Sequence, residues 1–428
     1  MTFLALLVAL FVLLYLGMPM FAALFLLPLA VLVWVEGSLP ALGELVIGHL
    51  DGYLLVAIPL FMLMAHVMVR GRVVDDLYGA AFALLRGVRG GVGIATVAAC
   101  TIFAAISGSS VATALTVGKI AIPQMLRYGM SRRGAYGVVA GGGTLGILIP
   151  PSAPMVLYAY VTETSVGALF LAGLIPGVMM ASMFALYCFV TERRAVAPAD
   201  TQAAAPGAAE GFSLARASWS LSLPVFVLGG IYMGVFTATE AAGTGTLYAI
   251  LIAALIYRSL RWRDLMEGFG EATRTSAMLL LIIAAAAIYG YMLTKLRVPQ
   301  ELTQLVLDWG LSRTGFLIGM MLLLFVLGLV LESFSIILLT MPAILSVLAQ
   351  LDIDKVWYGV LLTLSLEMAL ISPPVAMNLV VIKAITGAPL AEVNKAIIPY
   401  MLMLAFGTAL IVAFPGIALW LPRLAGYG

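Results

Sequence analysis

The chain alternates long apolar stretches with short polar loops. The stretches 134–160, 167–190, 275–294 and 396–421 contain no charged residue. Each is long enough to span a bilayer, because a helix of about 20 residues crosses the hydrocarbon core. The pattern therefore predicts an all-α polytopic membrane protein.

Composition supports this prediction. Apolar residues make up 63% of the 428 residues and charged residues 10%, against roughly 45–50% and about 25% in soluble domains. The apolar residues suffice for about a dozen spans, and soluble enzymes are excluded. The net charge of +2 gives no indication of nucleic-acid binding. The apolar start, residues 1–35, is interpreted as mature membrane helix; whether it forms one broken helix or two short spans stays open.

The basic residues of the loops predict the topology. Loop 36–51 contains three acidic residues and no Lys or Arg, whereas segment 70–89 contains four arginines. Because cytoplasmic loops are enriched in Lys and Arg, the first is expected outside and the second in the cytoplasm.

Two apolar segments are too short for two full spans and are expected to enter and leave the membrane on one side. The first, about 91–123, has basic residues on both flanks, which predicts a cytoplasmic re-entrant hairpin with its tip at Ile106–Ser110. The second, about 315–349, has mixed to acidic flanks, which predicts an external hairpin with its tip at Glu332–Ser335.

The two halves of the chain match each other. A polar segment, 192–216, is interpreted as a cytoplasmic linker between a first repeat, 1–191, and a second, 217–428. Pro150–Pro151 in the first repeat corresponds to Pro373–Pro374 in the second, and Pro176 and Pro399 share the same offset. Hairpins that enter from opposite faces indicate an inverted repeat, an architecture typical of secondary transporters.

Each doubled proline lies within an apolar stretch, 134–160 or 356–382, and is expected to break the helix there. Carbonyl groups freed by such a break need a partner in lipid. A hard cation such as Na⁺ is one candidate partner, and a kink sealed by neighbouring helices is the alternative. The hydroxyl groups of Ser107, Ser109 and Ser110 at the first hairpin tip are candidate ligands, although small residues also pack helices together.

Two further polar residues lie in apolar surroundings. Glu332, at the second hairpin tip, is a functional candidate because an intramembrane carboxylate is costly; it would contact a cation, relay a proton or pair within the hairpin. Asn378 is a candidate for substrate binding or for an interhelical hydrogen bond. The G-x-G-x-x-G spacing that begins at Gly141 follows no soluble strand, so a dinucleotide site is excluded. A serine enzyme pairing Ser109 with His66 has no support in the spacing.

Along its whole length the sequence resembles a known family, the large membrane subunits of tripartite ATP-independent periplasmic (TRAP) transporters. The matching segments are Gly17–Pro19, Ile58–Phe61, Phe103–Ala114, Gly143–Ser152, Thr237–Ala242 and Ser372–Val375. One departure is Glu332, where many members have Asp. The resemblance implies a non-enzymatic, elevator-type secondary transporter of the bacterial or archaeal inner membrane. It would import an organic anion, typically a carboxylate, with sodium as coupling ion and no other cofactor.

The resemblance also implies partners and sites. The partners are a separate four-helix membrane subunit and a soluble periplasmic substrate-binding protein. The implied first sodium site comprises Ser107, Ser109, Ser110, Gly146, Ile149 and Ser152. The implied second site comprises Gly328, Glu332, Ser335, Ala369, Ser372 and Val375. The substrate is expected near the doubled prolines, with Gly143, Thr144 and Asn378 close by, because the broken helices would direct positive dipole ends at a carboxylate. The alternatives kept are a proton-coupled carrier with Glu332 as relay and a non-transporting scaffold subunit.

Overall fold

The computed structural model describes residues 2–37, 42–71, 73–85, 87–192, 214–373 and 376–427. Within these ranges the chain forms twenty α-helices and no β-strand. Seven helical segments of the described chain are long and apolar enough to cross a membrane. They are Tyr53–Arg70, Arg132–Thr162, Val166–Thr191, Ala238–Ile256, Trp262–Lys295, Ser333–Gln350 and Leu390–Ala413. The prediction of an all-α polytopic membrane protein is confirmed.

The N-terminal apolar segment forms two helices rather than one broken helix. Helix α1 (Thr2–Tyr15) and helix α2 (Met20–Glu36) are separated by a turn at Gly17. Gly17 has a φ of 87°, a left-handed conformation that a glycine adopts without strain. Three short elements follow, α3 (Leu42–Leu50), the 3₁₀ turn η1 (Tyr53–Val56) and α4 (Ala57–Arg70).

The first half of the core contains a helical hairpin and a broken helix. After α5 (Val73–Leu85), helices α6 (Gly91–Ser107) and α7 (Ser110–Arg127) form the hairpin. The break at the hairpin tip is made by Gly108, which has a φ of 58°. Helices α8 (Arg132–Leu148) and α9 (Ala153–Thr162) form the broken helix, and α10 (Val166–Thr191) closes the half.

The second half repeats these elements in the same order. Its hairpin consists of α15 (Arg313–Gly328) and α16 (Ser333–Gln350), and its broken helix of α17 (Lys355–Leu370) and α18 (Met377–Thr386). Helix α19 (Leu390–Ala413) follows. The starts of α7 and α16, and also their ends, are related by the same sequence offset as the doubled prolines. The structural repeat therefore extends over whole helices.

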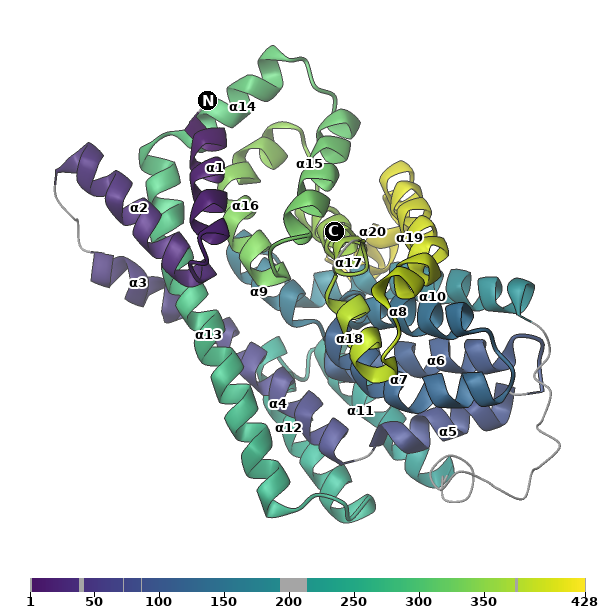
Figure 1. Ribbon diagram of the computed structural model, residues 1–428. Helices are drawn as coiled ribbons and strands as arrows, with labels where there is room; N and C mark the ends of the chain where they lie inside the picture. Colours follow the sequence, from purple (N-terminus) through teal and green to yellow (C-terminus); the bar gives the residue numbers. More distant parts are fainter. Residues whose placement is uncertain are drawn as a thin grey trace.

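The remaining helices form a layer beside this core. The long helix α13 (Trp262–Lys295) runs along one side of the molecule and packs against α2, α3 and α4 (Figure 1). Helix α12 (Ala238–Leu251), which continues into the π-turn η2 (Ile252–Ile256), packs on α4. We call α1–α4, α12 and α13 the flanking layer, and α6–α10 with α15–α19 the core bundle. Helices α11 (Leu214–Tyr232), α14 (Val298–Asp308) and α20 (Gly416–Leu424) connect or cover these parts.

Three details differ from the sequence-based expectation. The apolar stretch 396–421 is not one helix, because α19 ends at Ala413 and α20 starts at Gly416. Pro415 lies between them, and because a proline has no backbone N–H to donate, it favours a break at this position. The end of the expected linker is helical from Leu214 onward, and residues 193–213 lie outside the described chain. Helix α13 begins at Trp262, well before the span expected from residue 275.

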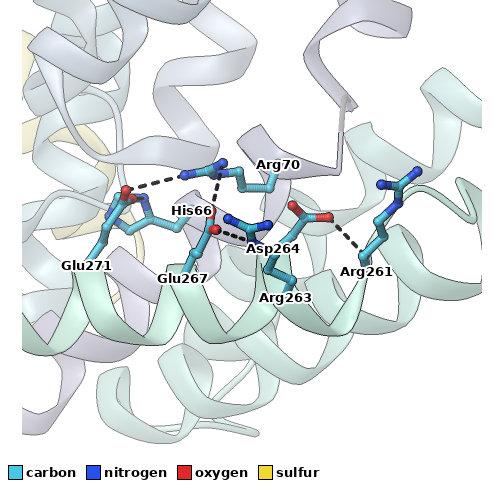
Figure 2. Close-up of polar contacts among 7 residues, drawn as sticks. All are labelled: His66, Arg70, Arg261, Arg263, Asp264, Glu267 and Glu271. Carbon is cyan, nitrogen blue, oxygen red and sulfur yellow. Dashed lines mark hydrogen bonds and ion pairs between the residues drawn. The ribbon is translucent and has the colours of Figure 1, made fainter.

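Ion pairs join the first turns of α13 to the end of α4. Arg70 of α4 contacts Glu267 at 3.2 Å and Glu271 at 3.4 Å, and His66 Nδ1 lies 3.0 Å from Glu271 (Figure 2). Arg263 contacts Glu267 at 2.9 Å within α13. We call these five residues the charged seam. They stabilise the polar first turns of α13 beside the end of α4.

Candidate functional site

The two hairpin tips and the two broken helices meet around one cavity of about 510 Å³. The first tip contributes 106–111 and the second 328–334. Pro151, Ala153 and Pro154 line the cavity from the first broken helix, and the second broken helix lines it on both sides of its break. The flanking layer closes one side with Phe61 and Met62 of α4 and Thr275 of α13. The cavity therefore lies between the core bundle and the flanking layer.

Four helices begin at this cavity. Residues at the starts of α7, α9, α16 and α18 all line it. The first turn of a helix has backbone N–H groups without an intrahelical partner and carries partial positive charge. Serines cap the two helices of the first half, Ser109 accepting from Ala112 N and Ser152 from Met155 N. Helices α16 and α18 have no side-chain cap, so their first N–H groups can donate to a ligand.

The charged lining of the cavity is limited to Glu332. No Lys, Arg or His of the described chain lines it. Glu332 is the N-cap residue of α16 and its side chain is exposed. Within the described lining, the groups that could bind an anion are therefore backbone N–H groups and not basic side chains.

Close backbone contact joins the first hairpin tip to the first broken helix. A Cβ atom added at Gly146 would overlap the backbone of Ser109, and one at Gly108 would meet the carbonyl oxygen of Pro151. Ser107 Oγ lies 2.9 Å from Thr113 Oγ1, and Thr113 Oγ1 donates to the Ser109 carbonyl at 2.8 Å. These contacts place hydroxyl and carbonyl oxygens beside the helix break.

The second tip contacts the second broken helix in the same way. A Cβ atom at Gly328 would overlap Ala369, and Ala369 is the counterpart of Gly146 by the offset that relates the doubled prolines. The backbone N–H of Ser372 donates to the Ala369 carbonyl at 3.1 Å. Ser335 and Ser372 are both buried. Oxygen atoms again surround the break.

The candidate residues divide into two groups around the cavity. Lining residues are Ser107, Ser109, Ser110, Pro151, Gly328, Glu332 and Ala369. Residues that do not line it are Gly143, Thr144, Gly146, Ile149, Pro150, Ser152, Ser335, Ser372, Pro373 and Asn378. Pro374 and Val375 lie outside the described residues. No group of three or more His, Cys, Asp or Glu residues that could hold a metal ion occurs in the described chain, so a cation there would depend on carbonyl, hydroxyl and single carboxylate oxygens.

Asn378 makes an interhelical hydrogen bond. Its side chain is fully buried, and Nδ2 donates to Ser110 Oγ at 2.9 Å and to the Ala140 carbonyl at 3.4 Å. Of the two roles that the sequence left open, the structure contains the hydrogen bond. Gly143 likewise allows close helix packing, because a Cβ atom there would meet Ala114 of α7.

Several lining residues were not predicted from the sequence. They are Phe61, Met62, Thr275, Met377 and Val380. Phe61 and Thr275 belong to the flanking layer, and their sequence neighbourhoods are ordinary membrane helix. Only the packing of that layer on the core bundle brings them to the cavity.

Comparisons with known proteins agree with this architecture. The family model for the tripartite ATP-independent periplasmic transporter, DctM component, matches residues 7–417. The chain is 37% identical to the C4-dicarboxylate TRAP transporter large permease protein of Pseudomonas aeruginosa, over 93% of each chain. It is 33% identical to the ectoine TRAP large permease of Halomonas elongata, covering 87% of this chain and 86% of the relative. It is 31% identical to the sialic acid TRAP large permease of Vibrio cholerae, over 97% of each.

Solved structures share the fold. The YdaH transporter of Alcanivorax borkumensis superposes with a TM-score of 0.64 at 14% identity, covering 88% of this chain and 87% of that one. MtrF of Neisseria gonorrhoeae gives a TM-score of 0.56, also at 14% identity, over 88% and 83%. The arrangement of helices in this chain is therefore also found in these two solved structures. The chain belongs to the tripartite ATP-independent periplasmic (TRAP) transporter family, as its DctM component, the large permease subunit, and is not an enzyme.

Proposed function

We propose that this subunit imports an organic anion by sodium-coupled transport with an elevator motion. The core bundle would carry the anion and the sodium ions as one unit, and the flanking layer would remain fixed against a small membrane subunit. A soluble periplasmic binding protein would deliver the anion. We place the complex in the cytoplasmic membrane of a bacterium or archaeon, as the family name and the basic loops 70–89 and 258–263 suggest.

The observation that carries this proposal is the composition of the cavity. Four helix N-termini suit a carboxylate, yet the described lining contains no basic side chain and one carboxylate, Glu332. Binding an anion there without added positive charge would be unfavourable in low-dielectric surroundings. The oxygen-rich contacts between each tip and its broken helix suit Na⁺, a hard cation. Sodium bound at these contacts would supply the missing positive charge.

The names of relatives support an anionic substrate. Relatives are named as permeases for C4-dicarboxylates and for sialic acid, and another relative, from Oleidesulfovibrio alaskensis, is named as an isethionate TRAP permease. We propose a carboxylate or a similar organic acid as the substrate of this chain.

The position of the cavity suggests a conformation open toward the cytoplasm. Thr275 lines the cavity and directly follows Arg274, the last charged residue before the apolar part of α13. The charged seam and the basic loops lie at this same end of α13. The binding site would thus lie near the cytoplasmic surface in this state.

Sodium binding can be tested without knowing the substrate. We expect the unfolding midpoint of the detergent-purified subunit to rise in NaCl relative to choline chloride at equal ionic strength. A ligand at a hundred times its dissociation constant stabilises the folded state by about 2.7 kcal/mol. Ser109→Ala and Ser372→Ala should each reduce the rise, because each removes a hydroxyl group beside a helix break.

A proton-coupled carrier is the second candidate, because Glu332 is the charged group in the described lining. Under that mechanism the midpoint would be equal in both salts, and uptake by the assembled complex would follow pH and ignore Na⁺. Glu332→Gln would then abolish coupling. A sodium-specific rise in the midpoint would contradict this candidate.

A further inference from the structure

The core bundle contains a second carboxylate, away from the cavity. Glu367 lies on α17, has an exposed fraction of 0% and does not line the cavity. Neither Oε1 nor Oε2 makes a hydrogen bond of good geometry within the described chain, and none of the ion pairs found there involves Glu367. A fully buried carboxylate without a cationic partner is strongly unfavourable in a membrane protein.

The surroundings of Glu367 belong to the other half of the molecule. Its carboxylate faces the hydroxyl group of Thr144 and the backbone of Ile147 and Leu148, all on α8. Thr144 and Glu367 are related by the same sequence offset as the doubled prolines, so they occupy equivalent positions in the two repeats. Equivalent positions of an inverted repeat meet only near its pseudo-two-fold axis. Glu367 therefore lies where the two broken helices cross.

Other oxygen atoms lie along this face of α8. Thr144 Oγ1 donates its proton to the Gly141 carbonyl at 2.6 Å, which leaves its lone pairs free to act as acceptors. One turn earlier, the Ala140 carbonyl accepts from Asn378 Nδ2, while Asn378 Oδ1 is buried and has no hydrogen-bond partner in the described residues. Both carboxylate oxygens of Glu367 and Oδ1 of Asn378 are thus buried oxygen atoms without a hydrogen bond of good geometry in the described chain.

Such a set of oxygen acceptors suits a hard monovalent cation, which needs carboxylate, hydroxyl and amide oxygens. We propose that Glu367 and Thr144, supported by Asn378, form a sodium-binding position between the two broken helices, distinct from the contacts at the two hairpin tips. The proposal rests on sodium coupling as proposed above. Ile149 and Ser372 follow within about two turns of Thr144 and Glu367, so a cation here is close to both breaks and links the two repeats electrostatically.

The test measures how many sodium ions stabilise the folded subunit. The unfolding midpoint is followed against NaCl concentration, with choline chloride keeping the ionic strength constant, and the slope against log[Na⁺] reports the number of ions bound. Glu367→Gln keeps the shape of the side chain and removes the charge. We expect its slope to fall by about one ion relative to the unchanged protein.

Two further variants separate this effect from general damage. Thr144→Val keeps the size of the side chain and should raise the sodium concentration for half-maximal stabilisation several-fold. Ser365→Ala is the matched control, because Ser365 is also buried on α17 but its hydroxyl group donates within its own helix, to the Leu361 carbonyl at 2.9 Å. The control should keep both the slope and the half-maximal concentration.

The outcomes distinguish this inference from the proposed function. If sodium leaves the unchanged protein unaffected, sodium coupling itself is wrong and the inference falls with it. A second outcome is that sodium stabilises the unchanged protein while Glu367→Gln and Thr144→Val keep the slope and the half-maximal concentration of that protein. In that case the site at Glu367 is wrong and sodium coupling stands. If Glu367→Gln keeps the sodium slope and alters only the pH dependence, the carboxyl group carries a proton and the inference is overturned.

Discussion

At the scale of single residues, the site depends on positions where a side chain is absent. Gly146 allows the backbone of Ser109 to lie against α8, and Gly328 leaves room for the side-chain methyl group of Ala369 on α17. The sequence indicated the hydroxyl groups of the tip and the doubled prolines, because their chemistry is local. It assigned Gly146 to a sodium site only through the family resemblance, and that assignment stays a prediction; what the structure adds is the close approach of the Ser109 backbone to Gly146.

Gly146→Ala should therefore disturb the first tip. The added methyl group overlaps the Ser109 backbone, and overpacking of this kind costs about 1–3 kcal/mol. We expect a lower unfolding midpoint and a weaker sodium response. The control is Gly229→Ala in α11, where the added Cβ has no neighbour within 4 Å and helix propensity favours Ala by up to about 1 kcal/mol. Equal behaviour of the two variants would contradict the close-contact explanation.

At the scale of elements, helix breaks were predictable and some helix ends were not. Doubled prolines forced the breaks after Leu148 and Leu370. The start of α13 was missed because its first turns contain charged residues, which are typical of a loop between spans. Those charges are stabilised by α4, as the charged seam shows (Figure 2). A contact between helices so far apart in the chain has no local signal.

The charged seam should contribute little stability in any single pair. The side chains of Arg70 and Glu267 are each 39% exposed, and exposed pairs contribute about 0.2–1 kcal/mol. A double-mutant cycle of Arg70→Met and Glu267→Gln, measured by the unfolding midpoint, should give a coupling energy in that range, and high salt should reduce it. A coupling energy several times larger would show that the seam is far less solvated than its exposure indicates.

At the scale of the whole molecule, two cavities lie at different positions along the length of α13. The site cavity reaches Thr275, and a second cavity of about 740 Å³ is lined by α13 residues from Ile283 to Thr294 together with α9 and α16. Both cavities thus lie where α13 faces helices of the core bundle. A shift of the core bundle that moved the tips from Thr275 to Gly290 would cover about 22 Å along α13.

Linking the two parts should stop such a motion. Thr275 of α13 and Phe334 of the second tip both line the site cavity. Cysteines at these two positions, in a background where the buried Cys100 and Cys188 are replaced by Ser or Ala, should be bridged by a mercury or bifunctional reagent. We expect bridging by mercury to abolish uptake by the reconstituted complex, and an excess of a dithiol, which takes up the mercury, to restore it. A bridged complex that transports normally would contradict an elevator motion.

The membrane class, the two hairpins, the two broken helices and their repeat could be predicted from the sequence, because hydropathy, proline and loop charge act over a few residues. The tertiary structure decided which oxygens and helix ends face one another. It brings Thr275 to the cavity, joins Asn378 to Ser110 and places Glu367 against Thr144. These arrangements depend on packing between helices that are far apart in the chain. The free energy of that packing cannot be inferred from the residues of any single helix.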